Sequence, residues 1–245
     1  MTGPTLACRQ VKFEGSSHRT SRGFPISSLQ AVLFDMDGLL VDTEPLWLEA
    51  ETEIMARLGG RPWTPQDQKA LLGGSLEKTV AYLLSKASRP QPSQVVADWV
   101  MDDVEARVLA GGAVARPGAR ELHAALRGAG IPVGLVTSSK RRFMRSVLDT
   151  TGFAFDITVC SDDVTATKPD PEPYQLAVKL LGADPAGCVV LEDSPNGVAS
   201  ARAAGCPVVA VPSIAAITPA PGVTVVGSLG DLDPERLRSL VLDGQ

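Results

Sequence analysis

The chain has 245 residues, enough for one large α/β domain or for a core with a smaller insertion, because domains usually contain roughly 100 to 200 residues. Its 44% hydrophobic and 21% charged residues are ordinary for a soluble globular protein. The 23 basic and 28 acidic residues leave a net charge of −5, which argues against a nucleic-acid partner. No apolar stretch approaches the roughly 18 residues that would span a membrane.

The cysteines and the N-terminal segment bear on the redox state of the thiols and on the cellular location of the protein. Cys8, Cys160, Cys188 and Cys206 show no CxxC spacing, so we expect reduced thiols in a cytoplasmic protein and neither disulfides nor a zinc site. Residues 1–29 are basic and show no periodicity, which predicts a flexible N-terminal extension, with an organelle transit peptide as the alternative. We expect a monomer or a weak dimer.

The first predicted element is a buried strand at residues 31–34, an apolar run that ends at Asp35. Asp35 and Asp37 lie at its carboxyl end, where open parallel sheets bind their ligands, and residues two apart in an extended chain project to the same side. One carboxylate can then attack phosphorus while the other passes a proton to the leaving oxygen. Taken alone, this DxDG segment fits a turn as well as a catalytic pair.

A helical insertion is predicted after the first strand. Apolar residues at four-residue spacing begin at Leu46 and again at Val96, a third helical segment covers residues 75–84, and no strand pattern lies among them. Pro45 suits a first helical turn, and Pro117 lies in the expected return linker. The expected domains are a helical cap domain at residues 45–115 and an α/β core domain formed by residues 30–44 and 116–245.

The rest of the chain alternates between strand and helix patterns. This alternation predicts right-handed βαβ units and a Rossmann-like α/β core, in which helices cover both faces of a parallel sheet. The expected strands lie at residues 131–136, 157–160, 188–191 and 207–211, and the expected helices at residues 141–150, 173–181 and 197–204.

Hydroxyl side chains follow the second core strand, in the segment Thr137-Ser138-Ser139-Lys140. Hydroxyls and free backbone N–H groups at the start of a helix form an anion site, so Thr137 and Ser138 are candidate phosphate ligands. In isolation, Ser138 or Ser139 would more commonly act as a helix N-cap.

Lys168 is the next candidate, in the segment TKPDPEPY. Pro169 disfavours a helical conformation for Lys168, which would fix the direction of its ammonium group. That group can neutralise phosphate oxygens as a compact charge. A lone lysine in a proline-rich loop is, however, more often simply exposed.

Two adjacent acids, Glu192 and Asp193, end the predicted strand at residues 188–191. Crowded carboxylates at a buried strand end are costly unless a cation or a hydrogen-bond donor compensates them. Hard oxygen ligands beside a phosphate site suit Mg²⁺. Alternatively, Asp193 caps the following helix.

Together, these four segments resemble the haloacid dehalogenase superfamily, in the subgroup with a helical cap inserted after the first motif. The segments DMDGLLVDTEP, VTSSK, KPDPEPY and LEDSPNGVASARAAG occur in the order of the family's four motifs, and the resemblance covers residues 31–212. Within the family, the chain is similar to the β-phosphoglucomutase-like and 2-deoxyglucose-6-phosphate phosphatase-like proteins.

The resemblance implies a role for each motif residue. Asp35 would be the nucleophile and Asp37 the general acid and base, while Thr137 and Lys168 would bind phosphate. Dehalogenases of the superfamily lack the second aspartate, so Asp37 favours phosphoryl transfer. The implied Mg²⁺ ligands are Asp35, the backbone carbonyl of Asp37 and Asp193, with Glu192 supporting the metal through water.

The expected function is therefore Mg²⁺-dependent hydrolysis of a small phosphorylated metabolite of the sugar-phosphate type, through an aspartyl-phosphate. A sugar phosphomutase similar to β-phosphoglucomutase is the closest alternative. Where such mutases carry a substrate-handling His and a cap-loop Arg, this chain has Trp47 and Leu76, and the EPLW segment resembles the sugar-phosphate phosphatases. A non-catalytic phosphate-binding module is the alternative from another class, although no motif acid is missing.

Overall fold

The structure, a computed structural model, describes residues 28–71 and 75–243. The predicted extension therefore lies outside the described residues, apart from its last two positions, and so does Cys8. Cys160, Cys188 and Cys206 are buried free thiols. Across the described ranges, no helix is both long enough and apolar enough to cross a membrane.

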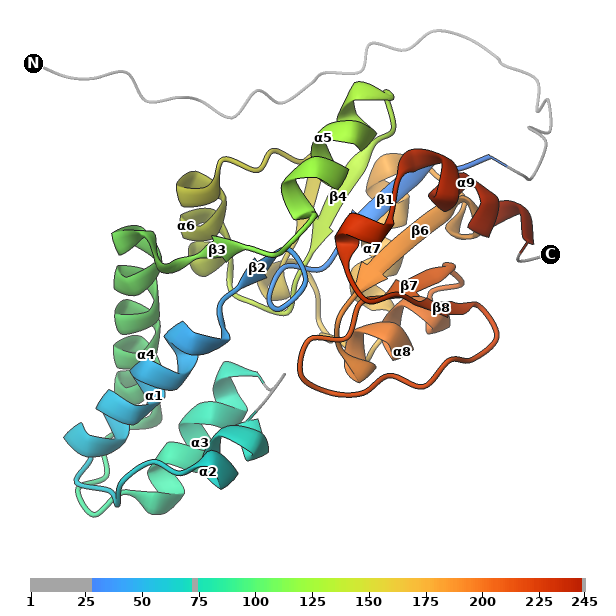
Figure 1. The fold of residues 1–245 in the computed structure, drawn as a ribbon. Helices are drawn as coiled ribbons and strands as arrows, with labels where there is room; N and C mark the ends of the chain where they lie inside the picture. Colours follow the sequence, from blue (N-terminus) through green and yellow to red (C-terminus); the bar gives the residue numbers. More distant parts are fainter. Residues whose placement is uncertain (1–27, 72–74, 244–245) are drawn as a thin grey trace, which may run out of the picture.

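A parallel sheet forms the centre of the molecule (Figure 1). Its strands lie in the order β5 (Ile157–Val159), β4 (Val133–Val136), β1 (Ala31–Phe34), β6 (Cys188–Glu192), β7 (Val208–Ala210) and β8 (Val223–Val225). Val32 of β1 lies opposite Val133 on one side and Val189 on the other. Because all neighbouring strands run parallel, their carboxyl ends meet at one edge of the sheet, where ligands bind in such folds.

Helices cover both faces of the sheet, since alternate strand residues point to opposite sides. Val32 and Phe34 contribute to the hydrophobic core on one face, and Ala31 and Leu33 to that on the other. The first face packs against α5 (Ala119–Gly128), α6 (Arg141–Thr151) and α9 (Pro234–Asp243), and the second against α7 (Glu172–Leu181) and α8 (Pro195–Ala203). The predicted Rossmann-like α/β class is thus confirmed.

The helical insertion leaves the core between two very short strands. β2 (Val41–Asp42) and β3 (Val114–Ala115) pair antiparallel, so the outgoing and returning connections run side by side. Between them lie α1 (Glu44–Arg57), α2 (Pro65–Leu71), α3 (Leu76–Lys86) and α4 (Ser93–Arg107), grouped to one side of the sheet (Figure 1). The apolar residues predicted at four-residue spacing are buried, and they lie on one face of α1 and α4 or directly after each helix. They are Leu46, Ala50, Ile54, Leu58, Val96, Val100, Val104 and Val108.

The elements that the sequence did not predict are mostly short. β2, β3 and β8 have two or three residues each, too few to show a period of two. The helices α2 and α5 were not predicted either, nor was α9. Single-turn helices complete the chain: η1 (Val108–Gly112), η2 (Ser161–Asp163), η3 (Pro185–Gly187) and η4 (Leu229–Asp231).

Candidate active site

The loop after β1 carries the acid pair to the carboxyl edge of the sheet. Asp35 is buried, and its backbone N–H donates to the carbonyl of Leu191 on β6 at 3.0 Å. Gly38 then adopts φ +87°, and a Cβ there would come within 2.2 Å of Asp193 Oδ2. Glycine at this position therefore allows the β1 loop to approach the acids of β6.

Asp37 is held by hydroxyl groups. Thr43 donates to Oδ1 at 2.6 Å, and Ser139 and Thr137 donate to Oδ2 at 2.7 and 3.3 Å. Burial raises the pKa of Asp37, and these hydroxyls partly offset the rise. A carboxyl group with a raised pKa and fixed orientation is suited to exchanging protons.

The structure brings Ser139 to Asp37, whereas the sequence singled out its neighbour Ser138. Ser139 also donates its backbone N–H to Thr137 Oγ1 at 3.0 Å. Ser138 is exposed and lines the cavity described below. Thr137 and Ser139 are two residues apart and reach the same carboxylate, while the residue between them points elsewhere.

Lys168 lies in the turn before α7 and is almost fully buried. Its ammonium group donates to Asp35 Oδ1 at 2.5 Å, to Glu192 Oε1 at 2.7 Å and to the carbonyl of Val136 at 2.8 Å. Burial alone would lower the pKa of Lys168, but the two carboxylates outweigh it and raise the pKa. Lys168 therefore remains charged. Its three acceptors fix the direction of the ammonium group.

Glu192 is completely buried, and donors surround its carboxylate. Tyr174, also fully buried on α7, donates its hydroxyl to Oε1 at 2.7 Å, beside Lys168. Oε2 accepts from the backbone N–H groups of Asp193 and Ser194 at 3.1 and 3.3 Å and from the Ser194 hydroxyl at 3.2 Å. With both oxygens engaged, Glu192 is better suited to fixing Lys168 than to binding a metal directly.

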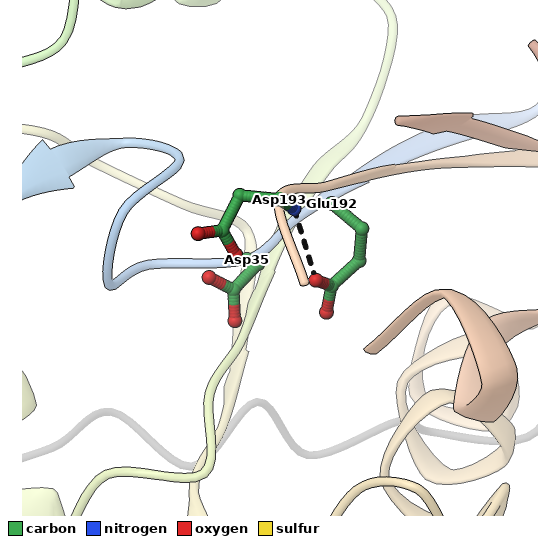
Figure 2. A group of neighbouring side chains, drawn as sticks. All are labelled: Asp35, Glu192 and Asp193. Carbon is green, nitrogen blue, oxygen red and sulfur yellow. Dashed lines mark hydrogen bonds between the residues drawn. The ribbon is translucent and has the colours of Figure 1, made fainter. Parts of the chain in front are cut away.

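Asp35, Glu192 and Asp193 each place a carboxylate oxygen within 4.8 Å of the others. Figure 2 shows the carboxylates of Asp35 and Asp193 facing one another, while Glu192 folds back toward the N–H of Asp193. Burial raises the pKa of Asp193, and the charge of Glu192 adds to this, while a hydrogen bond from Ser213 opposes it.

These acids fit a divalent cation. Asp35, Asp37, Glu192 and Asp193 are all acidic, and Lys168 is the only cation that forms an ion pair with any of them within residues 28–71 and 75–243. Burial raises the pKa of Asp35 well above its usual value, and the neighbouring acids add to the rise. The charge of Lys168 opposes it. A cation with oxygen-preferring chemistry would remove this repulsion between the two facing carboxylates.

A cavity of about 680 Å³ opens over these residues. One end is formed by the acids, Lys168 and the hydroxyl segment that begins at Thr137. The other end is formed by the helical insertion, mainly through α1, α2 and α3. All the site residues expected from the sequence line this cavity except Glu192, which lies beneath it.

Four residues that contribute to the site were not predicted from the sequence: Thr43, Ser139, Tyr174 and Ser213. The sequence pattern indicates only a helix cap for Ser139 and assigns no role at the site to Thr43, Tyr174 or Ser213. Ser213 follows β7 and donates to Asp193 Oδ2. The signal for Ser213 is its place just after a predicted strand, which it shares with Asp35, Thr137 and Asp193.

Comparison with known proteins gives a consistent result. The model of the haloacid dehalogenase-like hydrolase family matches residues 32–211. Hexitol phosphatase B of Escherichia coli (strain K12) is 34% identical over 188 residues, which are 75% of this chain and 83% of that protein. N-acetylmuramic acid 6-phosphate phosphatase of Pseudomonas aeruginosa is 33% identical over 187 residues, 75% and 81% of the two chains.

A solved structure is also similar in fold. The crystal structure of CbbY from Rhodobacter sphaeroides in complex with phosphate superposes with a TM-score of 0.75 at 28% identity. The match covers 83% of this chain and 96% of that one.

Proposed function

The chain belongs to the haloacid dehalogenase-like hydrolases and is a phosphatase, and we propose that it hydrolyses a small sugar or sugar-alcohol phosphate through an aspartyl-phosphate on Asp35. One observation carries this proposal: Asp35 is bonded to the buried cation Lys168, faces Asp193, and lies two residues before a second carboxyl group held by hydroxyls. Nucleophile, charge neutralisation and proton donor are thereby combined at one end of the cavity.

The first step is transfer of the phosphoryl group to Asp35. An oxygen of the Asp35 carboxylate attacks phosphorus in line with the ester oxygen, the P–O bond to the substrate breaks, and protonated Asp37 gives its proton to the departing alkoxide. Lys168, with the hydroxyls of Thr137 and Ser138, binds the phosphoryl oxygens and offsets their charge. The raised pKa of Asp37 favours the protonated form that this step requires.

The second step returns Asp35 to its free form. Asp37, now ionised, takes a proton from a water molecule, whose oxygen attacks phosphorus. The bond between phosphorus and Asp35 breaks, and inorganic phosphate leaves. The hydrogen bonds from Thr43 and Ser139 keep Asp37 in the same orientation for both proton transfers.

We propose Mg²⁺ as the cation, held by the carboxylates of Asp35 and Asp193 and by the backbone carbonyl of Asp37. When bound, Mg²⁺ would neutralise charge on the phosphoryl group and polarise its oxygens. The fit rests on the facing carboxylates, which repel one another without a cation. Glu192 supports the site from below by fixing Lys168 and the backbone of Asp193.

The helical insertion completes the proposal. We propose that residues 45–115 act as a cap domain that covers the cavity and excludes water while the aspartyl-phosphate exists. Trp47 and Leu76 of this segment line the cavity where a sugar phosphomutase would need a His and an Arg. We therefore expect phosphate release to exceed conversion of glucose 1-phosphate to glucose 6-phosphate. We also expect a cytoplasmic enzyme that acts as a monomer or a weak dimer.

The test is phosphate release from a panel of hexitol, hexose, pentose, triose and nucleotide monophosphates, with Mg²⁺ and with a chelator. We expect release from sugar or sugar-alcohol phosphates, its loss on chelation and its recovery with added Mg²⁺. Asp35→Asn should abolish turnover, because an amide is a poor nucleophile, whereas Asp149→Asn on the exposed side of α6 should not. Turnover undiminished in Asp35→Asn would exclude Asp35 as nucleophile, and release only from nucleotides would contradict the substrate class.

A further inference from the structure

A buried carboxylate lies at the end of the cavity remote from Asp35. Glu51, on α1, is only 3% exposed, yet it belongs to the cavity wall. Within residues 28–71 and 75–243, no group donates a hydrogen bond to its Oε2. An acceptor that is buried without a donor costs free energy in the unliganded protein, so its retention on a cavity wall points to a ligand that supplies the donor.

Glu51 and Glu44 are two hydrogen-bond acceptors along α1, and Glu44 is the one nearer to Asp37. Glu44 directly follows Thr43, the residue that donates to Asp37, and Glu44 and Glu51 are seven residues apart on one face of α1. Seven residues correspond to about 10 Å along a helix axis. Gln68 of α2 also lines the cavity and donates to Glu44 at 3.4 Å. Only a ligand with several carbon atoms beyond its phosphate reaches from Asp35 to Glu51.

An aromatic surface lies between the two glutamates. Trp47 occupies the intervening turn of α1 and lines the cavity, with its ring edge-on to Phe143 of α6, 5.5 Å between centroids. An aromatic ring beside carboxylate acceptors suits a carbon skeleton that presents C–H groups on one side and hydroxyl groups on another.

We propose that Glu51, together with Glu44, forms a subsite that accepts hydrogen bonds from hydroxyl groups of the substrate's carbon skeleton, several atoms from the phosphate. The subsite rests on the proposed function, because it presumes that the phosphoryl group lies at Asp35. It selects polyhydroxylated phosphates over phosphates of the same length that lack hydroxyls.

Hydroxyl groups fit this place better than an ammonium group. Burial raises the pKa of Glu51 to about 7, with Glu44 contributing and the Thr79 hydroxyl opposing. Near pH 7, Glu51 is therefore protonated in a large fraction of the molecules. A hydroxyl can donate to the ionised form and accept from the protonated form, whereas an ammonium group pairs only with the ionised form.

The test compares two substrates of equal carbon number, glucitol 6-phosphate and n-hexyl phosphate. The readout is the ratio of their kcat/KM values, which cancels damage to the phosphate end. We expect Glu51→Leu to lower this ratio by about 10- to 100-fold, the usual effect of losing a hydrogen bond to a charged group. Glu51→Gln should lower it by less, because the amide keeps one acceptor but loses the charge. Thermal unfolding of each variant would establish that it is folded.

Glu53→Gln is the matched control, because Glu53 lies on the same helix, is exposed and pairs with Arg107 outside the cavity. Its ratio should equal that of the unaltered enzyme. An unchanged ratio in folded Glu51→Gln and Glu51→Leu would overturn the subsite. A preference for glucosamine 6-phosphate over glucose 6-phosphate that disappears in Glu51→Gln would also overturn the subsite, because it would identify an ammonium group as the partner of Glu51. Hydrolysis of no sugar or sugar-alcohol phosphate by the unaltered enzyme would instead contradict the proposed function.

Discussion

At the scale of single residues, the ammonium group of Lys168 separates two buried carboxylates. Asp35 must keep a free carboxylate to attack phosphorus, yet burial raises its pKa and favours the protonated form. Lys168 opposes this effect by lowering the pKa of Asp35, and Glu192 with Tyr174 keeps Lys168 in position. Lys168 thus favours the ionised form of the nucleophile and also binds phosphate.

Replacing Lys168 should damage both activity and stability. Lys168→Met leaves Asp35 and Glu192 buried without a cation, so we expect kcat to fall at least about 100-fold and the free energy of unfolding to fall by about 3 kcal/mol. Phosphate release and urea unfolding would measure the two effects. Lys179→Met, on the exposed side of α7, should change neither. Full activity in Lys168→Met would show that Lys168 is only structural.

The sequence allowed residues at the candidate site to be predicted where they directly follow a strand. Asp35, Asp37 and Asp193 follow predicted strand ends, and the fold brings such ends together. The choice between Ser138 and Ser139 was not readable, because it depends on the local path of the chain after β4. The bond from Ser213 to Asp193 was not readable either, since it joins two different loops.

At the scale of elements, the short helix α2 depends on one carboxylate. Asp67 is buried, and its oxygens accept from Arg61 at 2.6 and 2.8 Å, from the Thr64 hydroxyl at 2.6 Å and backbone N–H at 2.8 Å, and from Tyr82 of α3 at 2.5 Å. A seven-residue helix is unstable alone, so these bonds hold it on α3. They thereby position Gln68, which lines the cavity from α2.

We predict that Asp67→Asn lowers the melting temperature by roughly 6 °C at pH 7, equivalent to about 2 kcal/mol, because the amide loses the ion pair and one acceptor. Hydrogen bonds, first from Arg61, lower the pKa of Asp67 below that of an unfolded aspartate. Its stabilisation is therefore complete above the unfolded pKa of about 4 and is lost as pH falls through the folded pKa.

Melting curves between pH 7 and pH 3 would check this prediction. The difference between the unaltered protein and Asp67→Asn should begin to narrow below about pH 4. Asp98→Asn is a suitable control, because Asp98 is exposed on α4 and bonded only to Gln94 among the residues described. A difference that stays constant down to pH 3 would contradict the role given to Asp67.

The sequence predicted long amphipathic elements better than short ones. α1 and α4 each bury apolar residues at four positions spaced four apart, counting the residue just after each helix, and this repetition makes the pattern visible. Helix α2 has only Leu71 as a buried apolar residue and is held by polar bonds, so it shows no apolar period. The pairing of β2 with β3 depends on residues more than 70 positions apart and left no local signal.

At the scale of the whole molecule, two of the contacts that attach the insertion to the core lie away from the cavity. The β2–β3 pair carries the connections, and Arg116 donates its N–H to the carbonyl of Leu40 at 2.9 Å. Farther out, Arg142 of α6 pairs with Asp102 at 2.8 Å and with Glu105, both on α4. The insertion therefore rests on the core at a point away from the cavity, since these ion-paired residues do not line it.

If this second contact positions the cap, reversing one charge should lower activity at a distance. Arg142→Glu places a third carboxylate beside Asp102 and Glu105, so we expect kcat/KM for the preferred sugar phosphate to fall about 3- to 10-fold, less at high salt. The double variant Arg142→Glu with Glu105→Arg should regain most of the loss, because it restores an ion pair. Arg145→Glu, exposed on the same helix, should have no effect. Equal kcat/KM values for Arg142→Glu and the unaltered enzyme at low salt would mean that the β2–β3 pair and the apolar packing of the insertion suffice to hold it over the cavity.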